Sequence, residues 1–407
     1  MAKYRPGQTR PPGCGSRSKA VKTAAGPTLK VPEGELSTMK GHLVLANGMV
    51  FSGQMLNGPV YADGEAVFNT SMNGYQEIIT DPSYAGQILT FTYPSIGNYG
   101  CGDYGFESVS PALRGLVIHE MAVRPDHYQS RWTLAEFLAQ YRIPCLTGVD
   151  TRAITRILRG HGTMGAVLTT CLDDLPEIIE AASRGRSWMQ LDLVESVTRP
   201  LPVTYGEGLL RIVLLDFGVK QNIIDSLVYR GCEVVVMPAG SCAEAVLEHH
   251  PDGLVLSNGP GDPQACRAAV GEIRKLLQTL PTFGICLGHQ LVALALGART
   301  YKLKYGHRGG NHTVKDLLSG RCLVTAQNHG YAVDPTSIPE EAEISFINVN
   351  DGTAEGLVHK TKPVLSVQFH PEASPGPRDS GYLFDQFLEM VRKHRSGPTA
   401  MQHCKGE

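Results

Sequence analysis

Residues 282–290 read Thr-Phe-Gly-Ile-Cys-Leu-Gly-His-Gln, and this stretch constrains the fold more than any other part of the chain. Its apolar run predicts a buried strand, and a helical pattern begins directly after the cysteine. Glycines on both sides of Cys286 allow a sharp turn, which presents the cysteine at the carboxyl end of the strand. The partial positive charge of a helix N-terminus makes such a sulfur nucleophilic. A buried, inert cysteine fits this stretch alone almost equally well.

A second motif supplies the acid–base partners that a cysteine nucleophile needs. Residues 362–368 predict a strand, and Phe-His-Pro-Glu follows at 369–372. If this segment stays extended, His370 and Glu372 point to the same side. The histidine can take the proton of Cys286 and later protonate a leaving amine, while the carboxylate fixes the histidine tautomer. The order of the three residues differs from that in α/β-hydrolases, where the acid precedes the histidine.

A third motif, Ser-Asn-Gly-Pro-Gly-Asp-Pro at 257–263, ends a short apolar strand in a loop of glycine and proline. Such a loop brings bare backbone N–H groups close to a ligand. We expect the N–H groups of Gly259 and Leu287 to form an oxyanion hole for a tetrahedral intermediate. Most glycine–proline clusters are only turns, so this loop is weak evidence without the other two motifs.

Composition excludes several classes of protein. The chain has 407 residues, which suffices for two or three domains, and a formal charge of −2, which gives no reason to expect nucleic acid as a partner. It contains no apolar run of the roughly 18 residues that a membrane span needs. Its ten cysteines show no disulfide or metal-ligand spacing, so we expect reduced thiols and a cytoplasmic protein. We expect no metal site, and packing or polar roles for His307, His312 and His329.

The ends of the chain differ from its middle. Residues 1–38 are rich in basic, glycine and proline residues and predict a disordered leader, although an organellar targeting peptide fits the same composition. Met39 precedes the first credible strand and is a candidate initiator. We place an N-terminal domain at 39–190, a linker at 191–209, a C-terminal domain at 210–395 and a tail at 396–407.

Both domains are expected to combine helices and strands, which makes the chain an α/β protein. The N-terminal domain reads as β-rich and α+β, with a hairpin at Asn47-Gly48 and a helix capped by Thr133 and Glu136. Loops with the polar composition of 69–87 often carry function, but solvated turns are the commoner structure, and we predict them here. From residue 210, strands alternate with helices, which predicts a mostly parallel, helix-covered sheet whose site lies at the carboxyl ends of its strands.

The three motifs at 257–263, 284–290 and 369–372 together closely resemble those of class I (triad-type) glutamine amidotransferases. The resemblance implies that Cys286 attacks the side-chain amide of glutamine. Ammonia then leaves with a proton from His370, and water cleaves the γ-glutamyl thioester. By the same resemblance, the contacts with glutamine map onto Ser83, Gly259, Gly261, Leu287, Gln290, Asn328, Gly330 and Tyr331. The family usually has phenylalanine at the position of Tyr331.

Motifs in the N-terminal domain narrow the resemblance. Asn-Thr-Ser-Met-Asn-Gly-Tyr-Gln-Glu at 69–77, Thr-Asp-Pro-Ser-Tyr at 80–84 and Gly-Val-Asp-Thr-Arg at 148–152 look like the small-subunit family of carbamoyl-phosphate synthetase. The resemblance implies a large-subunit partner that uses ATP, Mg²⁺ and the ammonia released here to make carbamoyl phosphate for arginine and pyrimidine synthesis. We find no nucleotide-binding fingerprint in this chain and expect it to carry no cofactor.

Three other functions stay open at this point. The chain could serve a different synthetase, which the N-terminal motifs disfavour, or it could be a cysteine peptidase or another hydrolase. It could also be a non-enzymatic regulatory subunit that keeps the fold, although it retains all three catalytic residues.

Overall fold

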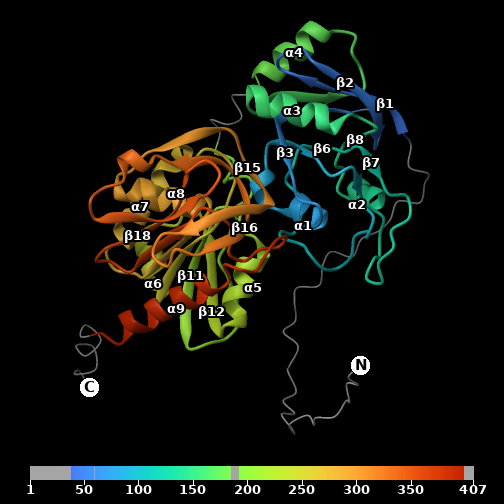
Figure 1. Ribbon diagram of the computed structural model, residues 1–407. Helices are drawn as coiled ribbons and strands as arrows, with labels where there is room; N and C mark the ends of the chain where they lie inside the picture. The colour runs from blue at the N-terminus through green and yellow to red at the C-terminus, as the bar shows by residue number, and fades with distance from the viewer. Residues whose placement is uncertain (1–37, 59, 185–191, 398–407) are drawn as a thin grey trace, which may run out of the picture.

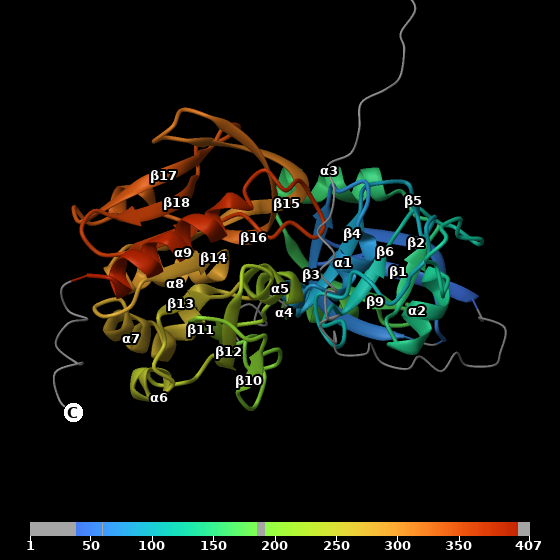
Figure 2. The ribbon, with the colours of Figure 1, turned by 90° about the horizontal axis from the view of Figure 1, so that it is seen from below.

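A computed structural model describes residues 38–58, 60–184 and 192–397 of the chain. It consists of a closed β-barrel and a ten-stranded sheet that lie side by side in both ribbon views (Figure 1, Figure 2). Among the described residues, no helix combines the length and apolar character required to cross a bilayer. The expected leader (1–38) and tail (396–407) fall almost entirely outside the described residues.

Seven strands close the barrel, in the order β1-β2-β8-β6-β4-β3-β9. They are β1 (Thr38–Leu45), β2 (Val50–Leu56), β3 (Tyr61–Asn69), β4 (Gln87–Phe91), β6 (Gly115–Val117), β8 (Cys145–Thr147) and β9 (Met164–Thr169). The two short strands β5 (Ser95–Ile96) and β7 (Glu120–Met121) pair separately. The hairpin expected at Asn47-Gly48 joins β1 to β2, and the positive φ of 86° at Gly48 explains why glycine is needed there. Barrel closure itself was not foreseen, because it depends on pairing between distant strands.

Helices pack on both faces of the barrel wall, because successive side chains of a strand point to opposite faces. Leu43 and Leu45 pack with residues of α3 (Thr151–His161), whereas the intervening Val44 packs under α4 (Leu175–Arg184) on the other face of β1. The helix α2 (Leu134–Gln140) begins with the expected capping box of Thr133 and Glu136. Each face of the barrel wall is therefore apolar where a helix lies on it.

The prediction of solvated turns at 69–87 is wrong. This stretch forms the helix α1 (Tyr75–Thr80) and the 3-10 turn η1 (Pro82–Tyr84), and most of its side chains are buried. Several of its polar groups are satisfied internally: Gln76 bonds the backbone of Gly102, and the Tyr75 hydroxyl donates to the carbonyl of Gly100. Polar composition was misleading because buried polar groups that pair with distant backbone leave no local signal.

The C-terminal sheet has the strand order β10-β12-β11-β13-β14-β19-β18-β16-β15-β17. Its strands are β10 (Val203–Tyr205), β11 (Leu210–Asp216), β12 (Cys232–Pro238), β13 (Gly253–Leu256), β14 (Thr282–Ile285), β15 (Thr300–Asp316), β16 (Cys322–Val333), β17 (Ala342–Asn348), β18 (Ala354–His359) and β19 (Val364–Val367). The five central strands from β12 to β19 are parallel, as expected, and the flanking strands are antiparallel. The segment expected to be a linker contributes β10 to the edge of this sheet.

Helices cover both faces of the parallel strands, as the alternating pattern predicts. On one face Ile212 and Leu214 of β11 pack with α5 (Gln221–Tyr229) and α9 (Tyr382–Arg395). On the other face Val213 and Leu215 pack with α6 (Ala243–Glu248), α7 (Arg267–Leu276) and α8 (Leu287–Leu296). The 3-10 turns η3 (Pro263–Cys266) and η4 (Pro335–Ser337) complete the described elements of this part.

The long strand β15 joins the two parts of the molecule. It extends from the sheet to the barrel, where the N–H of Thr163 donates to the carbonyl of Lys304 at 2.9 Å (Figure 1). Farther along, the N–H of Thr70 donates to the carbonyl of Arg308 at 3.2 Å. Residues of β3, α1 and η1 are thereby held against the carboxyl ends of the parallel strands.

Candidate active site

The turn between β14 and α8 holds Cys286 in a strained backbone conformation. Its φ of 55° and ψ of −104° lie outside the regions that non-glycine residues usually adopt. The neighbouring glycines make the turn possible. A Cβ at Gly288 would lie 2.2 Å from the carbonyl oxygen of Leu256, and one at Gly284 would lie 2.7 Å from that of Gly288. The predicted strand–turn–helix arrangement is therefore present.

The sulfur of Cys286 is buried among polar groups of three segments. Sγ lies 3.6 Å from the carbonyl oxygen of Asn328 and 3.8 Å from Nε2 of Gln368. The backbone N–H of Cys286 donates to the carbonyl of Val367 on β19, which joins the turn to the strand that leads to His370. The adjacent N–H of Leu287 is the first of α8 and has no acceptor within the helix.

His370 and Glu372 meet, although not for the reason expected. The chain does not stay extended after His370: it pairs briefly with Ala326 and then turns at Pro371 and Glu372. The turn nevertheless places Oε1 of Glu372 2.6 Å from Nδ1 of His370. Nδ1–H donates to this carboxylate, which leaves Nε2 for proton exchange. Nε2 of His370 is buried and has no hydrogen-bond partner among the described residues.

Lys220, at the start of α5, completes the charged group behind His370. Its Nζ donates to Oε1 of Glu372 at 2.9 Å and to the carbonyl of Ala373 at 2.6 Å. Burial alone would raise the pKa of Glu372, but the Lys220 ammonium and His370 lower it to about 2. Burial alone would lower the pKa of His370, but the Glu372 carboxylate and the Cys286 sulfur raise it to about 10. The geometry thus favours an ionised carboxylate beside a protonated imidazole.

One cavity connects Cys286 with all the residues expected to contact glutamine. The following predicted residues line it: Ser83, Gly259, Gly261, Leu287, Gln290, Asn328, Gly330 and Tyr331. Glu65, Gln87 and Lys302 line the same cavity from the barrel and from β15. His370 is not part of the cavity wall. It lines a smaller cavity beside Asn328.

The loop after β13 forms one wall of this cavity, and it can do so only with glycine at position 259. A Cβ at Gly259 would lie 2.1 Å from the carbonyl oxygen of Phe217, and Gly261 has a φ of 88°. Asn258 anchors the loop, because its side chain accepts from the N–H of Lys220 and donates to Oγ of Ser83 at 2.9 Å. Bare backbone thus faces the space beside Cys286.

The barrel contributes to this wall through Asp81 and Ser83. Oδ2 of Asp81 accepts from Nδ2 of Asn328 at 2.9 Å, and its Oδ1 accepts from the N–H of Ser83. Asn328 is the residue whose carbonyl lies beside the Cys286 sulfur. Asp81 therefore orders one wall of the C-terminal site from the N-terminal part of the chain.

Comparison with known proteins identifies the family. Residues 213–390 match the family model described as glutamine amidotransferase class-I, and residues 43–168 match that of the carbamoyl-phosphate synthase small chain, CPSase domain. The carbamoyl phosphate synthase small chain of Staphylococcus haemolyticus is 49% identical over 355 residues, which cover 87% of this chain and 96% of that protein. The chain belongs to the carbamoyl phosphate synthase small chain family.

A second curated relative is equally similar, and one solved structure is much more distant. The small chain of Symbiobacterium thermophilum is 49% identical over 357 residues, which cover 85% of this chain and 97% of that protein. A solved glutamine amidotransferase from Thermotoga maritima has 20% identity and a TM-score of 0.33, with 47% of this chain and 87% of that one covered. The family resemblance and the fold class that the sequence predicts are confirmed.

Sequence reasoning about this small chain missed Lys220, Asp81 and Glu65. All three are charged residues with little exposure, and each is paired with a residue more than 150 positions away. A lysine inside the pattern Asp-Phe-Gly-Val-Lys, directly after an apolar strand, was the only local signal for Lys220. The other two carry none, because their partners come from the other part of the molecule.

The small chain also holds a group of potential metal ligands, one of which, His329, lines the same cavity as Cys286. Among the described residues, His307, His329 and Glu355 form such a group. Both histidines were expected to have only packing or polar roles, and no sequence pattern predicted that Glu355 would lie beside them.

Proposed function

We propose that the chain is the glutaminase subunit of a carbamoyl-phosphate synthetase and that Cys286 is its nucleophile. The observation that carries this proposal is the position of the Cys286 sulfur. It lies at a strained strand–helix turn, borders a cavity, and has the His370–Glu372 pair close by. Family membership supports the same function.

In the proposed reaction the thiolate of Cys286 attacks Cδ of the glutamine side chain. The N–H groups of Gly259 and Leu287 stabilise the oxyanion that forms. The C–N bond then breaks, and the nitrogen takes a proton from Nε2 of His370 to leave as ammonia. Water attacks the γ-glutamyl thioester, His370 accepts its proton, and glutamate departs as the sulfur is restored. Glu372 and Lys220 hold the imidazole in the tautomer that exposes Nε2.

Glutamine is a zwitterion, and the cavity carries charges that suit it. Oε1 of Glu65 lies 2.9 Å from Nζ of Lys302, and both residues line the cavity wall. We propose that the Glu65 carboxylate binds the α-ammonium group, while the eight cavity-lining residues predicted from the family hold the rest of the substrate.

The ammonia needs a sheltered acceptor, since in water it is mostly ammonium and is not nucleophilic. We propose that a large subunit receives it and uses ATP and Mg²⁺ to make carbamoyl phosphate for arginine and pyrimidine synthesis. The names of the relatives and the match to the small-chain domain support such a partner. We propose that glutamine hydrolysis in this chain uses no cofactor, and we propose a cytoplasmic location.

A glutamine analogue that carries a diazoketone in place of the amide tests the nucleophile. We expect peptide mass spectrometry to find one adduct, on Cys286, and glutamine in excess to prevent it. The other nine of the ten cysteines serve as internal controls. An adduct elsewhere, or one on Cys286 that glutamine does not prevent, would refute the assignment.

A further inference from the structure

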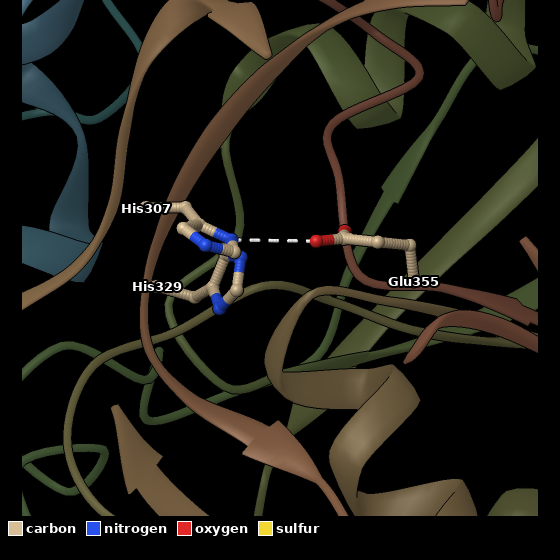
Figure 3. Close-up of side chains that lie close together, drawn as sticks. All are labelled: His307, His329 and Glu355. Atoms are coloured by element: carbon tan, nitrogen blue, oxygen red, sulfur yellow. Dashed lines mark ion pairs between the residues drawn. The ribbon is translucent and has the colours of Figure 1, made fainter. Parts of the chain in front are cut away.

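Three side chains converge behind the strand that carries Asn328 and Tyr331. His307 comes from β15, His329 from β16 and Glu355 from β18, and Figure 3 shows the carboxylate directed at the His307 ring. They are 7%, 5% and 0% exposed, and one potential ligand atom from each lies within 4.8 Å of the other two. None of the three takes part in the proposed glutaminase chemistry.

One nitrogen of His307 makes an ion pair but no hydrogen bond of good geometry. Nε2 pairs with Oδ2 of Asp351 at 2.8 Å. Nδ1 is buried and lacks a well-formed hydrogen bond to any described residue, although Oε1 of Glu355 is only 3.3 Å away. Two ligands bound at zinc-like distances to one tetrahedral ion lie about 3.4 Å apart. The spacing of these two atoms therefore suits a shared cation.

His329 has a mismatch of the same kind. Its Nδ1 lies 2.8 Å from the carbonyl oxygen of Tyr331, and its Nε2 lies 3.1 Å from Oε1 of Gln327. A neutral imidazole has one N–H, so one nitrogen directs a lone pair at an oxygen. Protonating both His329 and His307 would place two cations on rings whose centroids are 4.9 Å apart in a buried site. A donation from Nδ1 to Tyr331 leaves the lone pair of Nε2 directed toward the cluster.

The surroundings resemble the outer shell of a metal site. Metal-binding histidines usually donate their second nitrogen to a carboxylate or a backbone carbonyl, as His307 does to Asp351 and His329 to Tyr331. The Glu355 carboxylate is held by Nε2 of Gln327 at 3.1 Å and by Nδ2 of Asn348 at 3.3 Å. Each candidate ligand is thus oriented by a partner outside the cluster.

We propose that Nδ1 of His307, Nε2 of His329 and the Glu355 carboxylate bind a divalent cation of the zinc type. Two imidazoles and a carboxylate are a common zinc donor set, with water or Oε1 of Gln327 in the fourth position. The ligand atoms must approach one another by at most about 1.4 Å to reach zinc-like spacing. The bound ion ties β15, β16 and β18 together directly behind Asn328 and Tyr331.

The competing arrangement contains no metal. In it His307 is a protonated imidazolium held between Asp351 and Glu355. Burial alone would lower the pKa of His307, but these two carboxylates raise it to about 9. A proton then occupies the position of the proposed cation, and the two arrangements differ in whether zinc displaces it.

The test uses the full chain with Cys286→Ser, because the sulfur beside His370 could bind zinc itself. After chelator treatment, zinc affinity is measured by competition with a chromophoric chelator, and the ion is located by anomalous diffraction at the zinc edge. We expect one Zn²⁺ bound by the three side chains. His307→Gln and Glu355→Gln should each weaken binding more than about 100-fold, and Asp351→Asn about 10- to 100-fold.

Two variants distinguish a loss of zinc binding from a folding defect. Asp351 is exposed, so Asp351→Asn should fold normally and still show weaker binding. His312→Gln is the matched control, because the His312 ring packs against the His307 ring, with centroids 5.2 Å apart, without being one of the three ligands. The zinc affinity of this variant should match that of the parent. Zinc absent from this position in the anomalous map, or equal affinity in all variants, would overturn the proposal.

Discussion

At the scale of single residues, the site depends on charges that are buried together. Glu372 has a fully buried side chain between a lysine and a histidine, and each of the three needs the other two. Removing one member of such a group leaves an uncompensated buried charge, which is far more costly than losing a surface pair. We therefore expect Lys220, Glu372 and His370 each to support stability, in addition to the roles proposed for them in catalysis.

Replacing Glu372 by Gln should change stability in a pH-dependent way. The pKa of His370 is raised from 6.5 to about 10, so its contribution is complete below pH 6.5 and is lost as pH rises toward 10. The pKa of Glu372 is lowered from 4.5 to about 2, so its contribution is complete above pH 4.5 and is lost as pH falls toward 2. Urea unfolding of the wild type and of Glu372→Gln should show the largest difference in unfolding free energy between pH 4.5 and 6.5. A difference that is constant across the whole range would contradict the assigned charges.

Glu65→Gln should weaken the recognition of the α-ammonium group alone. We expect kcat/KM for glutamine to fall by about 10- to 100-fold, as for the loss of a charged hydrogen bond. Glutaramate, which lacks the α-amino group, should be hydrolysed equally by the wild type and the variant. Steady-state kinetics of the wild type and the variant, with glutamine and with glutaramate, test this prediction. Equal losses with both would show that Glu65 only supports the fold.

At the scale of elements, the β14–α8 turn was predictable because its requirements are local. Cys286 and its flanking glycines lie within five residues, and the capping box of α2 spans four. The sequence motif around His370 could be recognised, but its backbone conformation could not be predicted, since the chain turns where an extended segment was expected. The helix α1 was missed because Gln76 and Tyr75 are satisfied by backbone about 25 residues away.

Gly288→Ala tests whether the turn needs its close contact. The new methyl group would lie 2.2 Å from the carbonyl oxygen of Leu256, so we expect a loss of about 1–3 kcal/mol in unfolding free energy and impaired glutamine hydrolysis. Gly271→Ala in α7 is the control, because nothing lies within 4 Å of its Cβ. That variant should be stabilised by about 0.5–1 kcal/mol. Similar unfolding free energies for the two variants would contradict this account.

At the scale of the whole molecule, the proposed active site is shared between the two parts. Asp81 orders Asn328 across the interface, and Glu107 in the barrel part bonds both Asn222 and Ser374 near the triad. These contacts join segments more than 100 residues apart, which is why sequence patterns could not reveal them. The barrel is therefore part of the proposed active site and not merely attached to it.

Asp81→Asn should therefore reduce activity in the other part of the chain. The amide would direct a donor at Nδ2 of Asn328, and an unsatisfied buried group costs about 1–3 kcal/mol, which corresponds to roughly 5- to 150-fold in kcat/KM for glutamine. Asp173→Asn, on an exposed loop of the barrel, should leave the kinetics unchanged. Wild-type kinetics in the Asp81 variant would show that the barrel does not order the site.

The most direct test of the central claim measures carbamoyl phosphate made by this chain together with the proposed large subunit. With Cys286→Ser, synthesis from glutamine should fall by about 10⁴-fold or more, because the nucleophile is lost. Synthesis from added ammonium should continue at the wild-type rate. Glutamine-dependent synthesis that survives the substitution would contradict the assignment of Cys286.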